Sequence, residues 1–304
     1  MDSIIEVMNL CKSYPEVNAL DGFNLSVKPG VFGLVGPNGS GKTTLIRILL
    51  GLTNPTSGQA KVLGLDIANQ SFEIRNRIGI LHERPSYPRS MNVKSYLEKV
   101  VSIYGGTESA DELLDSVGLA YASNKGIGKL SAGMHQRLGF AQALAGNPEL
   151  VFLDEPTANL DVQGRREIID LIVELSSKND ISFFISSHIL SELERVCHSL
   201  AFIKAGRILD SGSISDILFR YTQGFWRVRT SSPQKFIIMA KKIPGVIYAR
   251  VSGSLQATIR TEEEVGDDFQ EQIWNLHETE DVKILAIEPS TTLEEAYEAV
   301  MGGV

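Results

Sequence analysis

One nine-residue stretch constrains this chain more than any other part of its sequence. Residues 36–44 read Gly-Pro-Asn-Gly-Ser-Gly-Lys-Thr-Thr, which has the spacing G-x-x-x-x-G-K-[ST] of a phosphate-binding loop. The apolar residues 31–35 before it predict a short buried strand, and residues 45–50 after it predict a largely buried helix face. A chance glycine-rich turn is not expected to have both neighbours. The sequence therefore predicts a strand–loop–helix unit that binds a nucleotide.

The chemistry of phosphate binding explains the residue types in this loop. Glycines let main-chain N–H groups close around a triphosphate, and the helix N-terminus adds favourable partial charge. Lys42 can reach the outer phosphates, while the Thr43 hydroxyl can take one position on Mg²⁺. The predicted nucleotide-binding residues of the loop are Gly36, Pro37, Asn38, Gly39, Ser40, Gly41, Lys42, Thr43 and Thr44.

A second strand end carries two acids that complement the loop. Residues 150–153 are apolar and predict a buried strand, which ends at Asp154 and Glu155. Read alone, an acidic pair after a strand is usually a solvated loop. In a chain with a phosphate loop it is the expected magnesium and base partner. We therefore predict that Asp154 holds Mg²⁺ and that Glu155 orients and deprotonates the attacking water.

Two single residues have both a structural and a functional interpretation. The predicted strand 181–185 ends near His188, and a lone histidine there is usually structural. Strand ends in this type of fold face the ligand crevice, however, so His188 is a candidate contact of the γ-phosphate. Tyr14 lies 22 residues before Gly36. Its ring either packs in the protein or stacks on a purine base, and the spacing leaves both possibilities open.

Composition limits the class of protein. The 304 residues suffice for about two domains, and 43% hydrophobic with 22% charged residues is ordinary for a soluble globular chain. Neither a membrane-spanning apolar run nor a signal-peptide layout is evident, so we expect a cytoplasmic protein. A net charge of −8 argues against a general nucleic-acid binder. The two cysteines, Cys11 and Cys197, are expected to be small buried thiols in a reducing compartment.

The order of predicted elements divides the chain into two domains. The first, 1–220, alternates strands with helices, begins with antiparallel strands at 4–10 and 23–27, and is interrupted by a helical block at about 93–147. The second, 225–304, has the order β-α-β-β-α-β of a small ferredoxin-like α+β sandwich. Its predicted core is Phe225, Val228, Val246, Ile259, Ile273, Trp274, Ile284 and Ile287. It carries no catalytic motif, so its expected role is a dimer brace, a sensor for a small effector or a passive cap.

Together, five spaced motifs resemble the ATP-binding cassette of ABC transporters over about residues 4–220. The resemblance implies an α/β P-loop NTPase fold with antiparallel β and helical subdomains. It also implies that ATP and Mg²⁺ are the cofactors. The matching segments are 36–44 for the Walker A loop, 130–136 for the signature, 150–155 for the Walker B strand, 158–161 for the D-loop, and His188 for the switch histidine.

The resemblance assigns roles to further residues. It implies that Tyr14 stacks on the adenine, and that Ser131 and Gly133 of the signature touch the ATP held by a second copy of the chain. Asp161 of the D-loop joins the nucleotide-binding candidates. Glu83 stands where the family has its Q-loop glutamine, so it is either a third residue near Mg²⁺ or a solvated loop carboxylate.

The signature departs from the commonest family form. It reads Ser-Ala-Gly-Met-His at residues 131–135, where the family usually has Ser-Gly-Gly-Gln. The serine and the glycine that face the phosphates in the family remain.

The function implied by the resemblance is that of an ATPase subunit of a membrane transporter. Two copies would associate head to tail around two ATP molecules and drive a permease on a separate chain. They would lie on the inner face of the cell membrane through that permease. The C-terminal extension is similar to that of prokaryotic two-component exporters, so an exporter without a nucleic-acid partner is expected.

Three alternatives share the cassette or part of it. Chromosome-maintenance or repair ATPases carry a very long coiled coil between the two halves, whereas only 46 residues separate Glu83 from Leu130. Soluble translation-factor cassettes usually occur in tandem, and this chain has one phosphate loop. A purely regulatory nucleotide-binding module would not need Glu155 and His188.

Overall fold

The computed structural model describes residues 3–178, 181–262, 268–277 and 282–302. Contacts divide the chain into two compact units, Met1–Ile214 and Ser215–Val304. The boundary lies six residues before residue 220, the predicted end of the first domain. As a result, most of the helix α8 (Ile214–Tyr221) falls in the second unit.

A mainly parallel sheet forms the centre of the first unit. Its order is β10-β9-β3-β8-β7-β6, with all neighbours parallel except β9 and β10. The central strands β3, β8 and β7 are buried along their whole length, as expected for a parallel sheet covered on both faces. Their bounds are β3 Val31–Val35, β6 Ile78–Leu81, β7 Leu150–Asp154, β8 Ser182–Ser187, β9 Ser199–Lys204 and β10 Arg207–Ser213.

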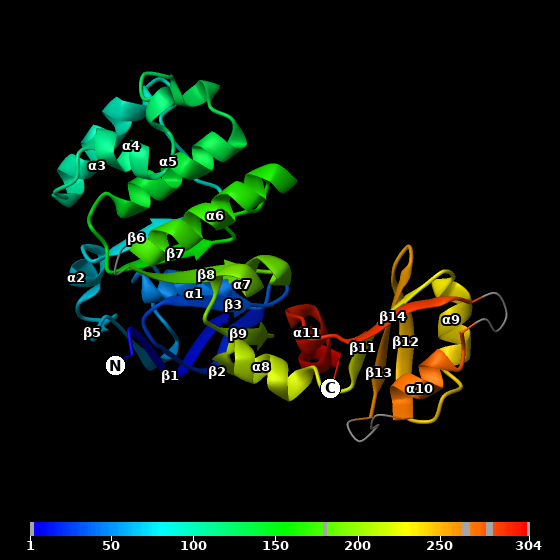
Figure 1. Ribbon diagram of the computed structural model, residues 1–304. Helices are drawn as coiled ribbons and strands as arrows, with labels where there is room; N and C mark the ends of the chain where they lie inside the picture. The colour runs from blue at the N-terminus through cyan, green and yellow to red at the C-terminus, as the bar shows by residue number, and fades with distance from the viewer. Residues whose placement is uncertain (1–2, 179–180, 263–267, 278–281, 303–304) are drawn as a thin grey trace. The chain divides into compact units, whose positions relative to one another are not determined.

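The helix after the phosphate loop is buried between two sheets. The apolar face of α1 (Lys42–Leu49) includes Leu45 and Ile48, both without exposed surface, as the sequence predicted. It packs in one core cluster with residues of the parallel sheet and of an antiparallel sheet. On the other side of the parallel sheet lies α6 (Val162–Lys178), followed by α7 (Leu190–Val196) (Figure 1). The short helix α2 (Ser71–Arg75) precedes β6.

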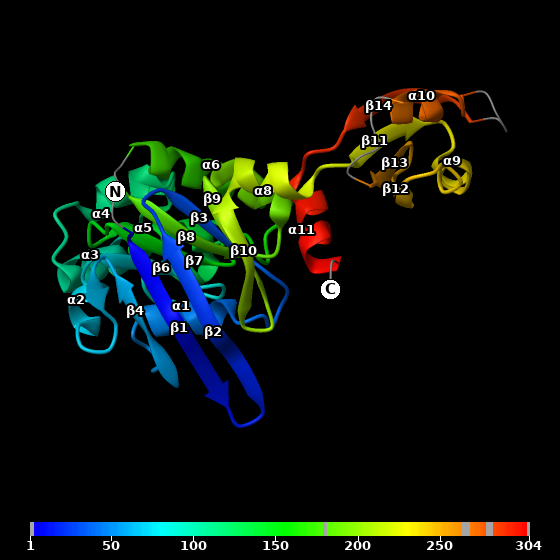
Figure 2. The same ribbon diagram turned by 90° about the horizontal axis from the view of Figure 1, so that it is seen from below.

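The antiparallel sheet has the order β2-β1-β4-β5. Its strands are β1 Ile5–Tyr14, β2 Val17–Val27, β4 Ser57–Val62 and β5 Leu65–Asp66. The first two strands form a long hairpin (Figure 2) that is longer than the predicted strands at 4–10 and 23–27. Because the hairpin extends to the pair Tyr14–Val17, Tyr14 lies at its tip.

The two cysteines differ in exposure. Cys197 is buried, as predicted, and burial raises the pKa of its thiol. The prediction for Cys11 was wrong, because this residue is only half-buried on β1. Its sulfur accepts a hydrogen bond from the main-chain N–H of Gly22 at 3.2 Å.

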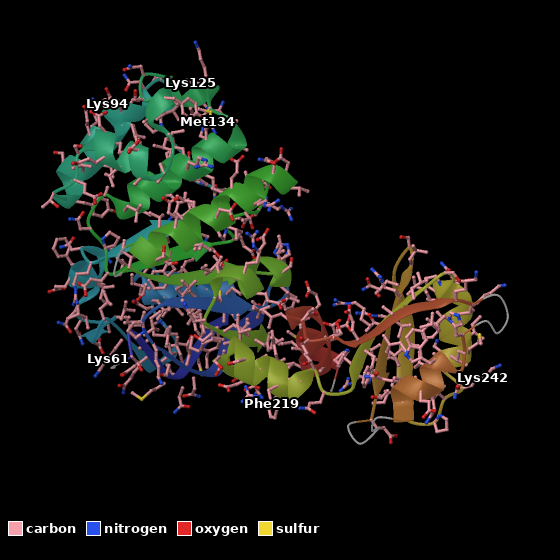
Figure 3. The ribbon with its side chains drawn as sticks, viewed as in Figure 1. Lys61, Lys94, Lys125, Met134, Phe219 and Lys242 are labelled. Carbon is pink, nitrogen blue, oxygen red and sulfur yellow. The ribbon has the colours of Figure 1, made fainter. Side chains whose placement is uncertain are left out.

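The helical block contains α3 (Val93–Tyr104), α4 (Ala110–Ser116) and α5 (Ala132–Leu144), with 3-10 turns at Ala120–Ala122 and Ile127–Lys129. Side-chain caps define the helix starts. Asn92 accepts a hydrogen bond from the N–H of Ser95, and Ser109 forms a capping box with Glu112. Figure 3 labels Lys94, Lys125 and Met134 in this block.

The second unit contains a four-stranded antiparallel sheet of order β12-β13-β11-β14. The element order is β-α-β-β-α-β, as the sequence pattern indicated, and a further helix follows. Residues 263–267, at the start of the predicted helix 263–276, lie outside the described residues. The bounds are β11 Phe225–Thr230, α9 Pro233–Ala240, β12 Val246–Gly253, β13 Gln256–Thr261, α10 Asp268–Trp274, β14 Ile284–Pro289 and α11 Leu293–Gly302.

The core of this unit corrects one predicted position. Trp274 is 43% exposed rather than buried. Ile273 is fully buried as predicted, and Phe269, which was not among the predicted core residues, is fully buried as well. Residues four apart share one helix face, and the residue after Ile273 turns away from that face. Phe225 is buried as predicted and packs edge-to-face with Tyr248.

Candidate nucleotide-binding site

The phosphate loop joins β3 to α1, and two of its glycines are sterically required. A Cβ at Gly36 would lie 2.3 Å from the carbonyl oxygen of Ile203. Gly41, which precedes α1, has φ +111°, and a Cβ there would lie 2.5 Å from the carbonyl oxygen of Ala19. The loop can therefore pass close to its neighbours only with glycine at these two positions.

Two polar groups of the loop are buried. The Lys42 ammonium donates to the carbonyl oxygens of Gly36 at 2.7 Å and Pro37 at 3.3 Å. Among the described residues, the buried Ser40 hydroxyl has no hydrogen-bond partner. Buried polar groups normally have partners, so this hydroxyl fits a ligand that carries oxygen atoms.

The loop lines a cavity of about 350 Å³ together with residues distant in the sequence. Its volume is typical of a small-molecule site. Tyr14 from the hairpin tip, Glu83 after β6 and Glu155 after β7 all line it with residues 38–44. The structure thus brings four sequence-predicted segments to one place.

Thr43 and Asp154 meet beside this cavity. The Thr43 hydroxyl donates to Asp154, with 3.2 Å between Oγ1 and Oδ2. Ser186 lies opposite Asp154 in the parallel register, and its hydroxyl donates to Oδ1 at 2.5 Å. No group of three or more His, Cys, Asp or Glu among the described residues could hold a metal ion by itself. The hydroxyl and carboxylate oxygens suit Mg²⁺, which binds few protein ligands and completes its shell with water and phosphate.

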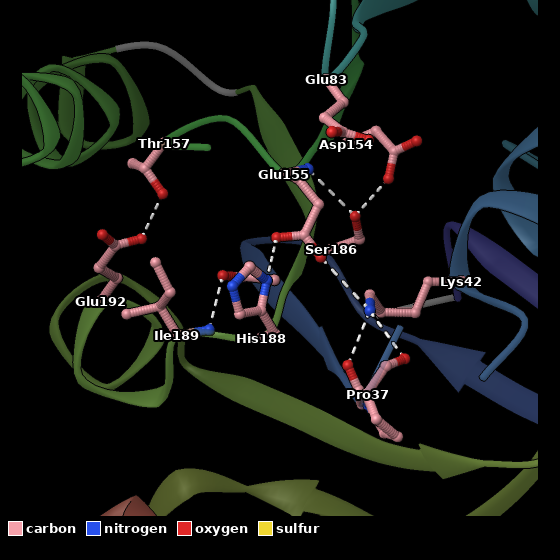
Figure 4. Close-up of polar contacts among 12 residues, drawn as sticks. Pro37, Lys42, Glu83, Asp154, Glu155, Thr157, Ser186, His188, Ile189 and Glu192 are labelled. Atoms are coloured by element: carbon pink, nitrogen blue, oxygen red, sulfur yellow. Dashed lines mark hydrogen bonds and ion pairs between the residues drawn. The ribbon is translucent and has the colours of Figure 1, made fainter. Parts of the chain in front are cut away.

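Glu155 lies between two basic side chains (Figure 4). Its Oε2 is 2.8 Å from Nδ1 of His188, and its Oε1 is 3.3 Å from Nζ of Lys42. The contact with Lys42 is an ion pair without hydrogen-bond geometry, because Oε1 has no hydrogen-bond partner among the described residues. Glu155 is 9% exposed and has φ +49°, in the left-handed region that non-glycine residues rarely adopt. A buried carboxylate held in a sparsely populated conformation beside a phosphate loop can serve as a base.

Three predicted site residues lie elsewhere. Ser131, Gly133 and Asp161 are absent from the described lining of this cavity. Ser131 caps α5 by accepting a hydrogen bond from the N–H of Met134, and Asp161 accepts one from Gly164 at the start of α6. These residues do not contact the loop's cavity within one chain.

Glu83 lies between the phosphate loop and the signature segment. It lines the cavity of the loop and also a second cavity of about 390 Å³, which the start of α5 and residues 158–160 line as well. Its carboxylate is 3.4 Å from the guanidinium of Arg84, and both side chains are exposed. Its placement near Mg²⁺ stays a prediction.

Sequence reasoning missed several polar partners near Glu155. Gln136 is buried and donates from Nε2 to the carbonyl oxygen of Pro156 at 2.7 Å. Thr157 donates to Oε2 of Glu192 at 2.5 Å. Burial raises the pKa of the Glu192 carboxyl, and the hydrogen bond from Thr157 opposes that shift. No local signal marked Gln136, because α5 also carries His135, Arg137 and Gln142.

A phosphate loop at the end of a parallel strand, with acids on the neighbouring strand ends, defines a P-loop nucleotide-binding protein. Residues 20–158 match the family described as ABC transporter. The bacitracin transport ATP-binding protein BcrA of Bacillus licheniformis is 38% identical over 246 residues, covering 80% of each chain. The BcrA protein of Enterococcus faecalis is 34% identical over 220 residues, covering 71% of each chain. The chain therefore belongs to the ATP-binding subunits of ABC transporters.

A solved structure supports the same fold. The cbiO1 protein of Clostridium perfringens, part of the ABC transporter complex cbiONQ, is 27% identical with a TM-score of 0.63, covering 72% of this chain and 96% of that chain. The predicted family, fold class and ATPase function are thus confirmed: the chain binds and hydrolyses ATP as a transporter subunit. Domains of this family dimerise and work with a transmembrane permease. Among the described residues, no helix combines the length and apolar composition needed to cross a bilayer.

Proposed function

We propose that two copies of this chain associate head to tail, so that each ATP lies between the phosphate loop of one copy and the signature of the other. Ser131 and Gly133 support this arrangement, because they do not line the cavity of their own loop. Gly133 is only partly buried, and a Cβ there would meet nothing within 4 Å. Asp161, at the exposed start of α6, belongs to the same proposed contact surface.

The observation that carries the proposed chemistry is the position of Glu155 between Lys42 and His188. The outer phosphates of ATP compete with Glu155 for the Lys42 ammonium, since both are anions near one cation. Once Lys42 binds phosphate, Glu155 keeps His188 and can accept a proton from the attacking water. Lys42 and His188 then stabilise charge on the transferred phosphoryl group.

Thr43 and Asp154 are the proposed holders of Mg²⁺, with Glu83 nearby. When bound, the ion neutralises charge that develops on the phosphates. The hydrogen bond from Ser186 to Asp154 orients the carboxylate toward Thr43.

Tyr14 is the proposed contact of the adenine. Its side chain is 41% exposed and lines the cavity of the loop. The ammonium of Lys12 lies 5.0 Å from the centre of the ring, and a ring of this kind can stack on a purine.

The relatives support an export function on the inner face of the cell membrane, through a permease on a separate chain. A bacitracin transport subunit covers most of this chain, so we propose that the cargo is an antibiotic of that class. Cells that express the chain with its permease should survive higher bacitracin concentrations than cells with the Glu155→Gln variant. Equal survival would rule out this cargo.

Residues 225–304 are proposed to brace the dimer. They form an antiparallel sheet with its own buried core, centred on Val228, Phe236 and Ile259. Removing residues 225–304 should leave ATP binding intact but make the ATPase rate depend more steeply on protein concentration. Superimposable curves for the full and truncated chains would exclude the brace and leave the sensor or the cap.

The central test is Glu155→Gln. This change keeps the size of the side chain and removes the base, so ATP should bind without hydrolysis and the dimer should persist with ATP and Mg²⁺. Light scattering measures the dimer and phosphate release measures hydrolysis. Glu73→Gln, at an exposed position on α2, is the matched control and should behave as the parent. A Glu155→Gln variant that hydrolyses ATP at the parental rate would overturn the assignment.

A further inference from the structure

The two residues after Glu155 each form a hydrogen bond with a different helix. Gln136 of the signature helix α5 donates to the carbonyl oxygen of Pro156 at 2.7 Å, and both atoms are buried. The Thr157 hydroxyl donates to Glu192 of α7 at 2.5 Å. Figure 4 shows Thr157 and Glu192 facing each other next to the Glu155–His188 pair. Hydrogen bonds to two different helices thus hold this short turn in place.

This turn determines where the Glu155 carboxylate lies. Glu155 has a left-handed backbone, φ +49°, and its N–H donates to the carbonyl oxygen of Ser186 at 3.0 Å. Its carbonyl accepts a hydrogen bond from the N–H of Ala158 at 3.1 Å, which closes the turn. A strained conformation of this kind persists only when surrounding contacts hold it.

The contact with α7 also links the turn to His188. His188 lies two residues before the start of α7, and the Ser187 hydroxyl accepts a hydrogen bond from the N–H of Ile189 at 3.0 Å. Glu192 lies one turn into this segment and is only partly exposed. The hydrogen bond from Thr157 to Glu192 therefore sets the distance between the turn after Glu155 and the segment that carries its histidine partner.

From these contacts we propose that Gln136, Thr157 and Glu192 are positioning residues that keep Glu155 between Lys42 and His188, and that Gln136 makes this position depend on the signature helix. The inference rests on the proposed role of Glu155 as the base. Because α5 belongs to the helical block, a displacement of its start moves Gln136 and with it the Pro156 carbonyl. The signature segment of a chain thereby affects the position of the base in its own chain, and it also contacts the ATP of the partner copy.

The test removes each hydrogen bond with little change in volume. Gln136→Met, Thr157→Val and Glu192→Leu should each lower kcat for ATP about five- to tenfold, the loss expected for one buried hydrogen bond in the reacting geometry. KM for ATP should stay within about twofold, because none of these side chains lines the cavity of the loop.

Conservative variants separate positioning from folding. Thr157→Ser keeps the donor and Glu192→Gln keeps an acceptor, so both should retain most of the parental kcat. Gln163→Met is the matched control for Gln136→Met, since Gln163 lies exposed on α6 and bonds only to Glu167 in the described structure. It should leave kcat unchanged. In a Glu155→Gln background, Gln136→Met should still form the ATP-dependent dimer.

The outcomes distinguish this inference from the proposed function. Parental kcat in Gln136→Met and Thr157→Val, or a loss of kcat that Thr157→Ser shares, would overturn the positioning role. A rise in KM equal to the fall in kcat would do so too, because it would show a role in binding. If Glu155→Gln itself retains the parental rate, the proposed base is wrong. If Glu155→Gln is inactive while the positioning variants are unaffected, only the present inference fails.

Discussion

The ion pair between Lys42 and Glu155 predicts a coupled effect on stability in the absence of nucleotide. Both side chains are nearly buried, at 6% and 11% exposure, and their charged atoms are 3.3 Å apart. Lys42→Met removes the cation and leaves the carboxylate without it. Lys42→Met combined with Glu155→Gln removes both charges, so the double variant should be less destabilised than the sum of the two single changes.

The structure sets the size of this effect. Removing one partner of a buried pair costs about 3–5 kcal/mol. Here Glu155 keeps His188, whose side chain is half exposed, so we expect the lower end, about 3 kcal/mol, for Lys42→Met. Glu155→Gln should cost about 1 kcal/mol, because Lys42 keeps two carbonyl acceptors. The double variant leaves no unpaired charge and should cost about 2 kcal/mol, for the hydrogen bonds lost by the two side chains. The coupling energy is then about 2 kcal/mol, within the range for residues in direct contact.

Thermal unfolding of the full chain and its three variants measures this coupling. For a unit of this size, about 3 kcal/mol lowers Tm by roughly 6–12 °C. The measurement is made at neutral pH without ATP or Mg²⁺, so that no ligand binds Lys42. Lys94→Met is the matched control, since Lys94 forms an exposed pair with Asp111 and should change Tm little.

Additivity would refute the reasoning. If the double variant loses as much stability as the two single variants together, within about 0.5 kcal/mol, the two charges do not interact in solution. A Lys42→Met variant with the parental Tm would show that the carboxylate does not depend on Lys42.

Three further predictions concern other parts of the first unit. In the native protein at pH 8, a thiol reagent should modify Cys11 only, because burial raises the pKa of the Cys197 thiol; after unfolding, both should react. The Arg77 guanidinium lowers the pKa of Glu149, so the pair stabilises the fold above the ordinary carboxyl value of 4.5 and loses this effect as pH falls through the lowered pKa. In urea unfolding, Arg77→Gln should therefore cost up to about 1 kcal/mol near neutral pH, and its difference from the parent should shrink below pH 4.5. Gly36→Ala should abolish measurable ATP binding by calorimetry, because its Cβ would lie 2.3 Å from a main-chain oxygen of β9.

Local patterns in the sequence predicted the elements that carry the chemistry. The strands before the phosphate loop and before Asp154, and the buried face of α1, follow from apolar runs and their period. Predictions that depended on contact with another helix or strand were less accurate. The strands predicted for the first hairpin were too short. Trp274 was predicted in the core of the second unit, where Phe269 is buried instead. Which residues of a helix are buried depends on the surface against which the helix packs, and the local sequence pattern does not specify that surface.

What the sequence by itself determined is the set of chemical groups available to this protein. A glycine-rich loop with Lys42 and Thr43, and acids at the end of a buried strand, predict phosphate binding and hydrolysis, because these patterns belong to short segments. The tertiary structure alone decided which groups meet. The order β3-β8-β7 places Ser186 beside Asp154 and brings His188 to Glu155, and strand order arises from packing between distant segments. The same packing carries Gln136 to the turn after Glu155, a contact across 20 residues that no local pattern encodes.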